Sequence, residues 1–148
     1  TMKHLSLFCL AGLLLIICMP ATSTAQQAPY TEGSVWGITL VRVKSGMSDD
    51  YLRSLAKTWR NTYEEAKKQG LILSYKLLSG DAANRDDWDL MLMIEYKNMA
   101  SLDGFDAKYR AIAAKTIGSD EQQKNMYVKR IDIREIFGSK VIRELILK

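Results

Sequence analysis

A stretch of alternating side chains at residues 88–96, with the sequence WDLMLMIEY, predicts the central strand of a sheet. Alternate residues of a strand face opposite sides. One face would hold Trp88, Leu90, Leu92, Ile94 and Tyr96, and the other Asp89, Met91, Met93 and Glu95. Because both faces carry large apolar groups, we expect this strand to be covered on both sides.

The residues before this strand predict a strand, a helix and a second strand. Alternation over residues 35–44 indicates the first strand, and Ser48 is placed to cap a helix over residues 49–69. The buried stripe of that helix would contain Leu52, Leu55, Ala56, Trp59, Tyr63 and Ala66. Gly70 is suited to end the helix, and residues 71–78 read as the second strand, joined to the central one by a long polar loop.

The residues after the central strand predict a second helix and a fourth strand. The helix follows Ser101, with a stripe of Leu102, Phe105, Tyr109, Ile112, Ala113 and Ile117. Residues 118–125 are polar and fit a short helical turn, since Ser119 and Gln122 have capping-box spacing. Residues 126–137 read as the fourth strand, and Gly138 and Ser139 as a turn. Residues 141–147 fit either a last strand or a short helix.

The first 25 residues have the layout of a secretory signal. A short basic start is followed by an apolar run over residues 5–19, and small residues precede a cleavage site after Ala25. The run is shorter than the roughly 20 residues of a membrane span. We therefore expect a secreted or periplasmic protein with no stable membrane span after cleavage, in which residues 26–34 are a flexible leader and residues 35–148 one domain. An uncleaved anchor and a lipoprotein modified at Cys18 are the alternatives.

Cleavage at this site would remove both cysteines, Cys9 and Cys18, and the single histidine, His4. Disulfides, cysteine nucleophiles, Ser-His-Asp triads and histidine-ligated zinc or haem are then excluded from the mature chain. The remaining acidic residues lack the spacing of a calcium loop. The sequence therefore predicts neither a cofactor nor a metal site.

The charge of the chain is mild and mixed. The formal net charge is +4, of which Lys3 in the expected signal supplies one. Nucleic-acid binding requires a stripe of Lys and Arg, and the basic residues here are dispersed among acidic ones. We therefore expect no nucleic-acid partner.

The predicted order is strand, helix, strand, strand, helix, strand, which is that of the ferredoxin-like α+β fold. Both helices of that fold pack on one face of a four-stranded antiparallel sheet. The opposite face would carry Thr39, Val41, Val43, Met91, Met93, Glu95, Val128, Arg130, Asp132, Arg134 and Ile136. An apolar face of this size marks an interface, and a homodimer is the simplest way to bury it.

The chain resembles the dimeric α+β-barrel superfamily in this order and pattern over residues 35–136. That superfamily includes the cofactor-independent monooxygenases of antibiotic biosynthesis and small stress-response proteins. The resemblance implies that two sheets face each other and that small molecules bind between sheet and helices or inside the barrel. Haem-degrading members use a helical histidine, which the expected mature chain lacks. Residues 141–147 would be free to exchange between subunits.

Two groups of residues are candidates for a site. Trp59, Tyr63, Trp88 and Tyr109 are candidates to line a pocket for a small apolar or aromatic molecule, with Glu95 as the candidate catalytic base. Aromatic residues at helical spacing more often form ordinary core, and that is the favoured interpretation of these four. Glu95, Arg130, Asp132 and Arg134 are expected to form a polar cluster inside the barrel, either as further ligand-binding residues or as an ion-pair network that fixes strand register.

Three functions are compatible with these features. We expect an exported homodimer that binds a small apolar or aromatic molecule without catalysis. A cofactor-independent monooxygenase-like enzyme and a non-catalytic protein-interaction module are the alternatives. An open aromatic pocket would favour binding or catalysis, whereas a filled core would favour interaction.

Overall fold

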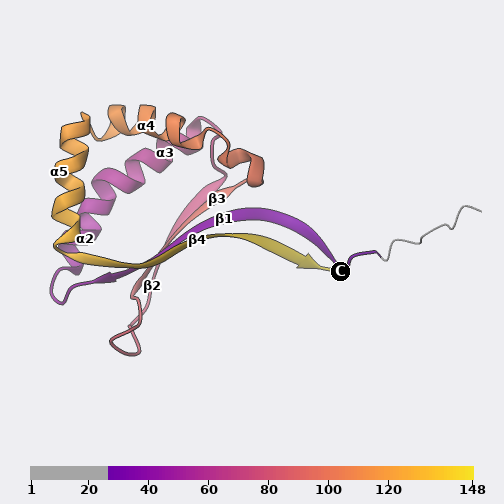
Figure 1. The fold of residues 1–148 in the computed structure, drawn as a ribbon, viewed down its shortest axis with the longest axis horizontal. Coiled ribbons are helices and arrows are strands. Elements are labelled where there is room, and N and C mark those ends of the chain that lie inside the picture. The colour runs from indigo at the N-terminus through magenta and orange to yellow at the C-terminus, as the bar shows by residue number, and fades with distance from the viewer. Residues whose placement is uncertain (1–26) are drawn as a thin grey trace, which may run out of the picture.

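The computed structural model describes residues 27–148, which form one sheet with helices against it (Figure 1). The elements are β1 (Tyr30–Val43), α2 (Ser48–Leu55), a π-helical segment η1 (Ala56–Arg60), α3 (Asn61–Lys68), β2 (Ser74–Ser79), β3 (Leu90–Tyr96), a 3₁₀ turn η2 (Met99–Leu102), α4 (Phe105–Thr116), α5 (Asp120–Ile131) and β4 (Arg134–Leu147). The protein therefore has the predicted α+β class.

The sheet has four strands in the order β2-β3-β1-β4, and each neighbouring pair is antiparallel. The helices lie on one side of it (Figure 1). The predicted order of elements is confirmed only in part, because the third helix, α5, stands where the fourth strand was expected to begin.

The central position and the two faces predicted for β3 are confirmed. Leu90, Leu92 and Tyr96 are buried under the helices, whereas Met91 and Met93 on the opposite face are half-buried. No helix of residues 27–148 packs on that second face, so its predicted cover would come from a second copy of the chain and stays a prediction. We call this second side of the sheet the open face.

Two clusters of buried side chains fill the space between sheet and helices. One joins Val35, Tyr63, Ala66, Ile72, Tyr96, Phe105 and Ile112, and the other joins Val41, Val43, Tyr51, Leu55, Leu90 and Leu92. Each fully buried side chain of this size contributes about 1.5–3 kcal/mol. The covered face therefore supplies most of the apolar burial that stabilises the fold.

The first helix is confirmed as one continuous run, because α2, η1 and α3 follow without a break over residues 48–68. Its buried stripe is confirmed in part, because Leu55, Tyr63 and Ala66 are buried as predicted. Tyr51, Thr58 and Thr62 are buried in addition, whereas the predicted Leu52 and Ala56 are exposed. The two buried threonines are tolerated because their hydroxyls are hydrogen-bonded, to the Ser54 carbonyl and to Thr116. Gly70 ends the helix with a φ of 69°, as predicted.

The prediction of a strand over residues 126–137 is wrong for its first half. The capping box of Ser119 and Gln122 is present, but the helix it starts continues to Ile131 instead of ending after one turn. Arg130 is therefore helical. β4 begins only at Arg134, and it contains Gly138 and Ser139, which were predicted to form a turn. Residues 141–147 are the end of this same strand.

The face predicted for β1 is also wrong. Ile38 pairs with Met93 and Leu40 with Met91, so these residues occupy the open face. Thr39 and Val41 pair with Leu92 and Leu90 and therefore lie on the covered face. On β4, Arg134 and Ile136 pair with Val43 and Val41, which places them on the covered side too.

β1 and β4 extend together beyond the rest of the sheet. β1 begins at Tyr30, five residues before the predicted start, and β3 pairs with it only from Val35 onward. Tyr30, Thr31 and Glu32, which the sequence placed in the leader, instead pair with the end of β4. We call this two-stranded projection, residues 30–34 with residues 143–147, the arm (Figure 1).

The signal predicted for residues 1–25 lies outside the described residues. From residue 27 to residue 148, no helix has the length and apolar character needed to cross a membrane.

Candidate functional site

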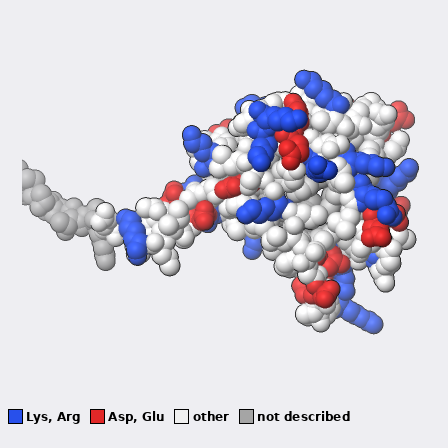
Figure 2. All heavy atoms as spheres, turned by 180° about the vertical axis from the view of Figure 1, so that it is seen from behind, with Lys and Arg blue, Asp and Glu red and all other residues white. Residues whose placement is uncertain are grey.

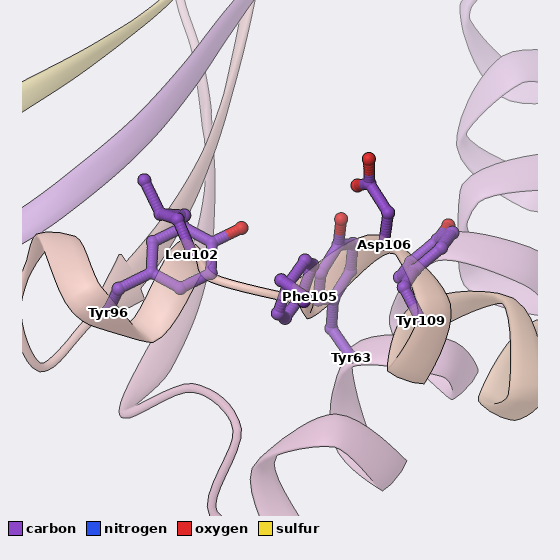
Figure 3. A pocket seen from close by; sticks show the side chains of 7 residues that line it. Tyr63, Tyr96, Leu102, Phe105, Asp106 and Tyr109 are labelled. Carbon is purple, nitrogen blue, oxygen red and sulfur yellow. The ribbon is translucent and has the colours of Figure 1, made fainter.

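A cleft of about 530 Å³ opens beside the buried cluster that contains Phe105. It lies between α3, the end of β3 and the start of α4. Its lining consists of Tyr63, Tyr96, Leu102, Gly104, Phe105, Asp106 and Tyr109. The three tyrosine hydroxyls and the Asp106 carboxylate lie on the same side of it, around the Phe105 ring (Figure 3). We call this space the tyrosine cleft.

The aromatic rings of the cleft pack against one another as a row of neighbouring pairs. The Tyr96 and Phe105 rings meet edge to face with centroids 5.2 Å apart, and the Tyr63 and Tyr109 rings are tilted at 5.6 Å. Trp59 extends the group by an edge contact with Tyr63 at 5.3 Å. Offset and edge contacts of this kind are the favoured aromatic geometries, so the rings hold each other in place.

The tyrosine hydroxyls of the cleft are neutral at physiological pH. Burial raises the pKa of Tyr63, and the neighbouring Tyr109 and Tyr96 raise it further. Burial also raises the pKa of Tyr96 to about 12. Burial raises the pKa of Tyr109 as well, although the positive charge of Arg130 opposes that rise. The cleft therefore offers uncharged O–H groups, which donate hydrogen bonds to carbonyl or hydroxyl oxygens of a ligand.

The local backbone explains how residues from β3, η2 and α4 reach one cleft. The Asn98 side chain caps η2 by accepting a hydrogen bond from the Ser101 N–H. Gly104 then turns the chain into α4 with a φ of 66°, a left-handed conformation that favours glycine. This turn places Leu102 and Phe105, on either side of the glycine, along the same cleft.

Two of the predicted pocket aromatics line the tyrosine cleft, Tyr63 and Tyr109, and Trp59 lies behind them. Trp88 does not join them. It precedes β3, its backbone N–H donates to the Asp87 carboxylate at 2.9 Å, and it takes part in none of the ring contacts of residues 27–148.

Glu95 lies on the opposite side of the sheet from the tyrosine cleft. It is on the open face, where its carboxylate accepts a hydrogen bond of 2.5 Å from the Ser74 hydroxyl on β2. The expected polar cluster of Glu95 with Arg130, Asp132 and Arg134 is therefore not formed. Arg130 is on α5 and Arg134 is on the covered side, whereas Glu95 points away from both.

Arg130 and Arg134 instead pack against the first helix. The Arg130 guanidinium donates to the Thr58 hydroxyl at 3.3 Å, and that of Arg134 donates to the Tyr51 hydroxyl at 3.1 Å. Arg130 and Tyr109 also line a second, smaller cleft, so Tyr109 stands between the two clefts. The candidate residues predicted from the sequence therefore divide between two clefts. Tyr63 lines the first, Arg130 lines the second, and Tyr109 lines both.

Tyr96, Leu102, Phe105 and Asp106 belong to the tyrosine cleft but were not predicted as site residues. Tyr96 and Phe105 were assigned to the strand face and the helix stripe, where an apolar pattern gives the same signal for a filled core and for a cleft wall. The usable signal was chemical, since Tyr63, Tyr96 and Tyr109 place three hydroxyls on faces predicted to be buried.

The possible metal ligands and the surface charges complete the description of the candidate sites. Residues 27–148 contain no group of three or more His, Cys, Asp or Glu side chains able to hold a metal ion. On the face shown in Figure 2, Lys and Arg lie interspersed with Asp and Glu. No protein-family model matches the sequence, and no curated protein matches it either.

Proposed function

We propose that the protein is an exported homodimer of the ferredoxin-like, dimeric α+β-barrel type that binds a small aromatic molecule in the tyrosine cleft. The observation that carries the proposal is the open space beside Phe105, which three neutral hydroxyls and two apolar side chains line. Ligand sites are typically largely apolar hollows with a few polar groups that fix orientation.

The open face supports the homodimer. It carries Trp36, Ile38 and Leu40 from β1, Met91 and Met93 from β3, Leu78 from β2 and Ile142 from β4. The register also places Lys76, Glu95 and Lys140 on this face, among the apolar residues. Large exposed apolar groups on all four strands of one face are a usual mark of an interface. A second copy placed sheet to sheet would bury the same residues on both partners, as two-fold symmetry requires.

The export proposal rests on the sequence of the first 25 residues, with its apolar run and small-residue cleavage site. The dimeric-barrel type is supported by the strand order β2-β3-β1-β4 and by the helices on one face.

Binding fits the geometry better than catalysis by Glu95. A general base must lie within hydrogen-bond reach of the proton it removes. Glu95 is separated from the tyrosine cleft by the sheet itself and is engaged by Ser74. The Asp106 carboxylate at the cleft favours a neutral or cationic ligand over an anionic one. A neutral phenol or a similar single-ring compound has the matching shape and polarity.

The test measures binding of p-cresol, a neutral phenol, by calorimetry to the purified protein expressed from residues 1–148. Leu102→Trp places a large ring in the tyrosine cleft and should abolish binding. Met99→Trp is the matched control, because Met99 belongs to the same turn but is exposed and outside the cleft lining. Equal binding by the two variants, or no saturable binding by the unaltered protein, would contradict the proposed site.

A further inference from the structure

The second cleft lies between η1 and α5 and has a different chemistry from the first. It measures about 310 Å³, and its lining is Thr58, Tyr109, Ile117, Gln123, Lys124, Met126, Tyr127 and Arg130. This volume is at the lower end of the roughly 300–1,000 Å³ that small-molecule sites span. We call it the arginine cleft. Its polar groups are mostly cationic or hydrogen-bond donors, and the remainder is apolar or aromatic.

Arg130 is a half-buried cation without a carboxylate partner. The ion pairs found among residues 27–148 join Arg53 to Asp50 and Arg143 to Glu32, and neither includes Arg130. Its Nε–H is buried and has no hydrogen-bond partner within these residues. Burial of a charged donor without a partner costs free energy, so the site is destabilised as long as no anion or acceptor is present.

A second cation increases this imbalance. Arg134 contacts the first helix, as Arg130 does. The guanidinium carbon of Arg134 lies 5.5 Å from the centroid of the Tyr51 ring. Burial lowers the pKa of Arg130, and the nearby positive charge of Arg134 lowers it further. Lys124 is the second basic side chain that lines the cleft, and Arg134 is not part of the lining. An anion bound here would be attracted by Arg130 and Lys124, with the charge of Arg134 close behind Arg130.

Thr58 holds the Arg130 guanidinium in a fixed orientation. The Thr58 hydroxyl donates its proton to the Ser54 carbonyl at 2.8 Å, so its oxygen is left to accept from Arg130. Thr58 is 1% exposed and lies in the π-helical segment η1, a distortion that is frequent at functional sites. Only one of the five guanidinium N–H groups is used by this contact, and the others, which include the buried Nε–H, have no hydrogen-bond partner among residues 27–148.

We propose that the arginine cleft binds a small organic monocarboxylate with a single-ring or short aliphatic body. The carboxylate accepts charge-assisted hydrogen bonds from Arg130, with Lys124 nearby, and the apolar body packs between Ile117, Met126 and the rings of Tyr109 and Tyr127. This inference goes beyond the proposed function and does not depend on it, because the ligand charge and most of the lining residues differ.

The test titrates the purified protein, expressed from residues 1–148, with three probes by calorimetry. Benzoate carries both the charge and the ring, benzyl alcohol only the ring, and inorganic phosphate only the charge. The titrations are repeated in Leu102→Trp, in which the tyrosine cleft is filled and cannot take up benzyl alcohol. In that variant we expect saturable binding of benzoate and much weaker binding of the other two. Benzyl alcohol or phosphate binding there as tightly as benzoate, or no benzoate saturation by about 10 mM, would overturn the proposal.

Variants locate the site. Arg130→Gln should raise the benzoate Kd about tenfold or more, the range expected for loss of a hydrogen bond to a charged group. Arg53→Gln removes the same charge from an exposed position on α2, outside the lining of the cleft, and should leave the Kd unchanged. Equal Kd values for these two variants would refute the role of Arg130.

A cavity-filling variant covers the case in which Arg130→Gln fails to fold. Met126→Trp should abolish benzoate binding and retain p-cresol binding, whereas Leu102→Trp should do the reverse. If only one of the two variants behaves as expected, the proposal for one cleft fails while the proposal for the other stands. Benzoate binding that survives in Met126→Trp would place the anion elsewhere and overturn the inference.

Discussion

The covered face and the open face of the sheet are made from the same strands, but they reach different degrees of burial. On the covered face, Val35 and Val41 are completely inaccessible beneath the helices. On the open face, Trp36, Leu40 and Met93 remain half-buried although they are equally apolar. Composition therefore does not distinguish the two faces. The difference lies in whether another element of the same chain packs against the side chains.

Ile38 is a buried residue in the middle of the open face. It is only 7% exposed, although no helix of the described chain covers it. Its neighbours across the strands are Met93 and Lys140, whose long side chains are placed to shield it. A face that buries its own middle in one subunit needs only its outer residues covered by a partner, which lowers the ordering cost of association.

The largest effect is expected when a charge on the covered face of β1 is compared with the same charge on its open face. Val41→Asp puts a carboxylate into the cluster with Tyr51 and Leu55, and should cost several kcal/mol, a large part of a typical stability of roughly 5–15 kcal/mol. Leu40→Asp, one residue away on the open face, should leave the unfolding free energy of the subunit much less affected. Urea unfolding measures both. Similar losses would show that the faces are not distinct.

A smaller effect, on assembly and not on folding, is expected at Met93. Met93→Lys adds a charge next to Ile38 in the middle of the open face and should halve the mass seen by light scattering. Ala111→Lys adds the same charge to an exposed position of α4 and serves as the control. A monomeric unaltered protein, or a Met93→Lys variant that keeps twice the chain mass, would contradict the proposed homodimer.

The smallest effect concerns the pH dependence of the covered face. Burial raises the pKa of Tyr96 from 10.0 to about 12, so above pH 10 the unfolded chain loses this proton while the folded chain keeps it. The contribution of Tyr96 to stability is therefore complete below pH 10 and declines up to about pH 12. Tyr96→Phe should make the decline in unfolding free energy over this range shallower. Identical slopes for the two proteins would exclude Tyr96 as a source.

The sequence predicted features that depend on local pattern. The first helix, its end at Gly70 and the division of β3 into two faces follow from periodicity within about 20 residues, and each is confirmed. The register of β1 could not be predicted in this way. Both of its faces are apolar, so only pairing with β3 decides that Leu40 and not Val41 is on the open face.

The fourth strand was misplaced because its pattern fits two structures. The apolar residues Met126, Val128 and Ile131 suit a strand as well as a helix, and the capping box marks where a helix starts but not where it stops. The same ambiguity affected the site. Tyr63 and Tyr109 line the tyrosine cleft, but Glu95 was grouped with arginines that the corrected fold places on the other side of the sheet.

The arm brings the two ends of the described chain together. The N–H of Lys148 donates to the carbonyl of Pro29 at 3.0 Å, so both ends meet at the tip of the arm, away from the helices (Figure 1). A surface linkage or a fused protein attached at either end would therefore hold the molecule by its projection. Both clefts would then stay facing the surrounding solution.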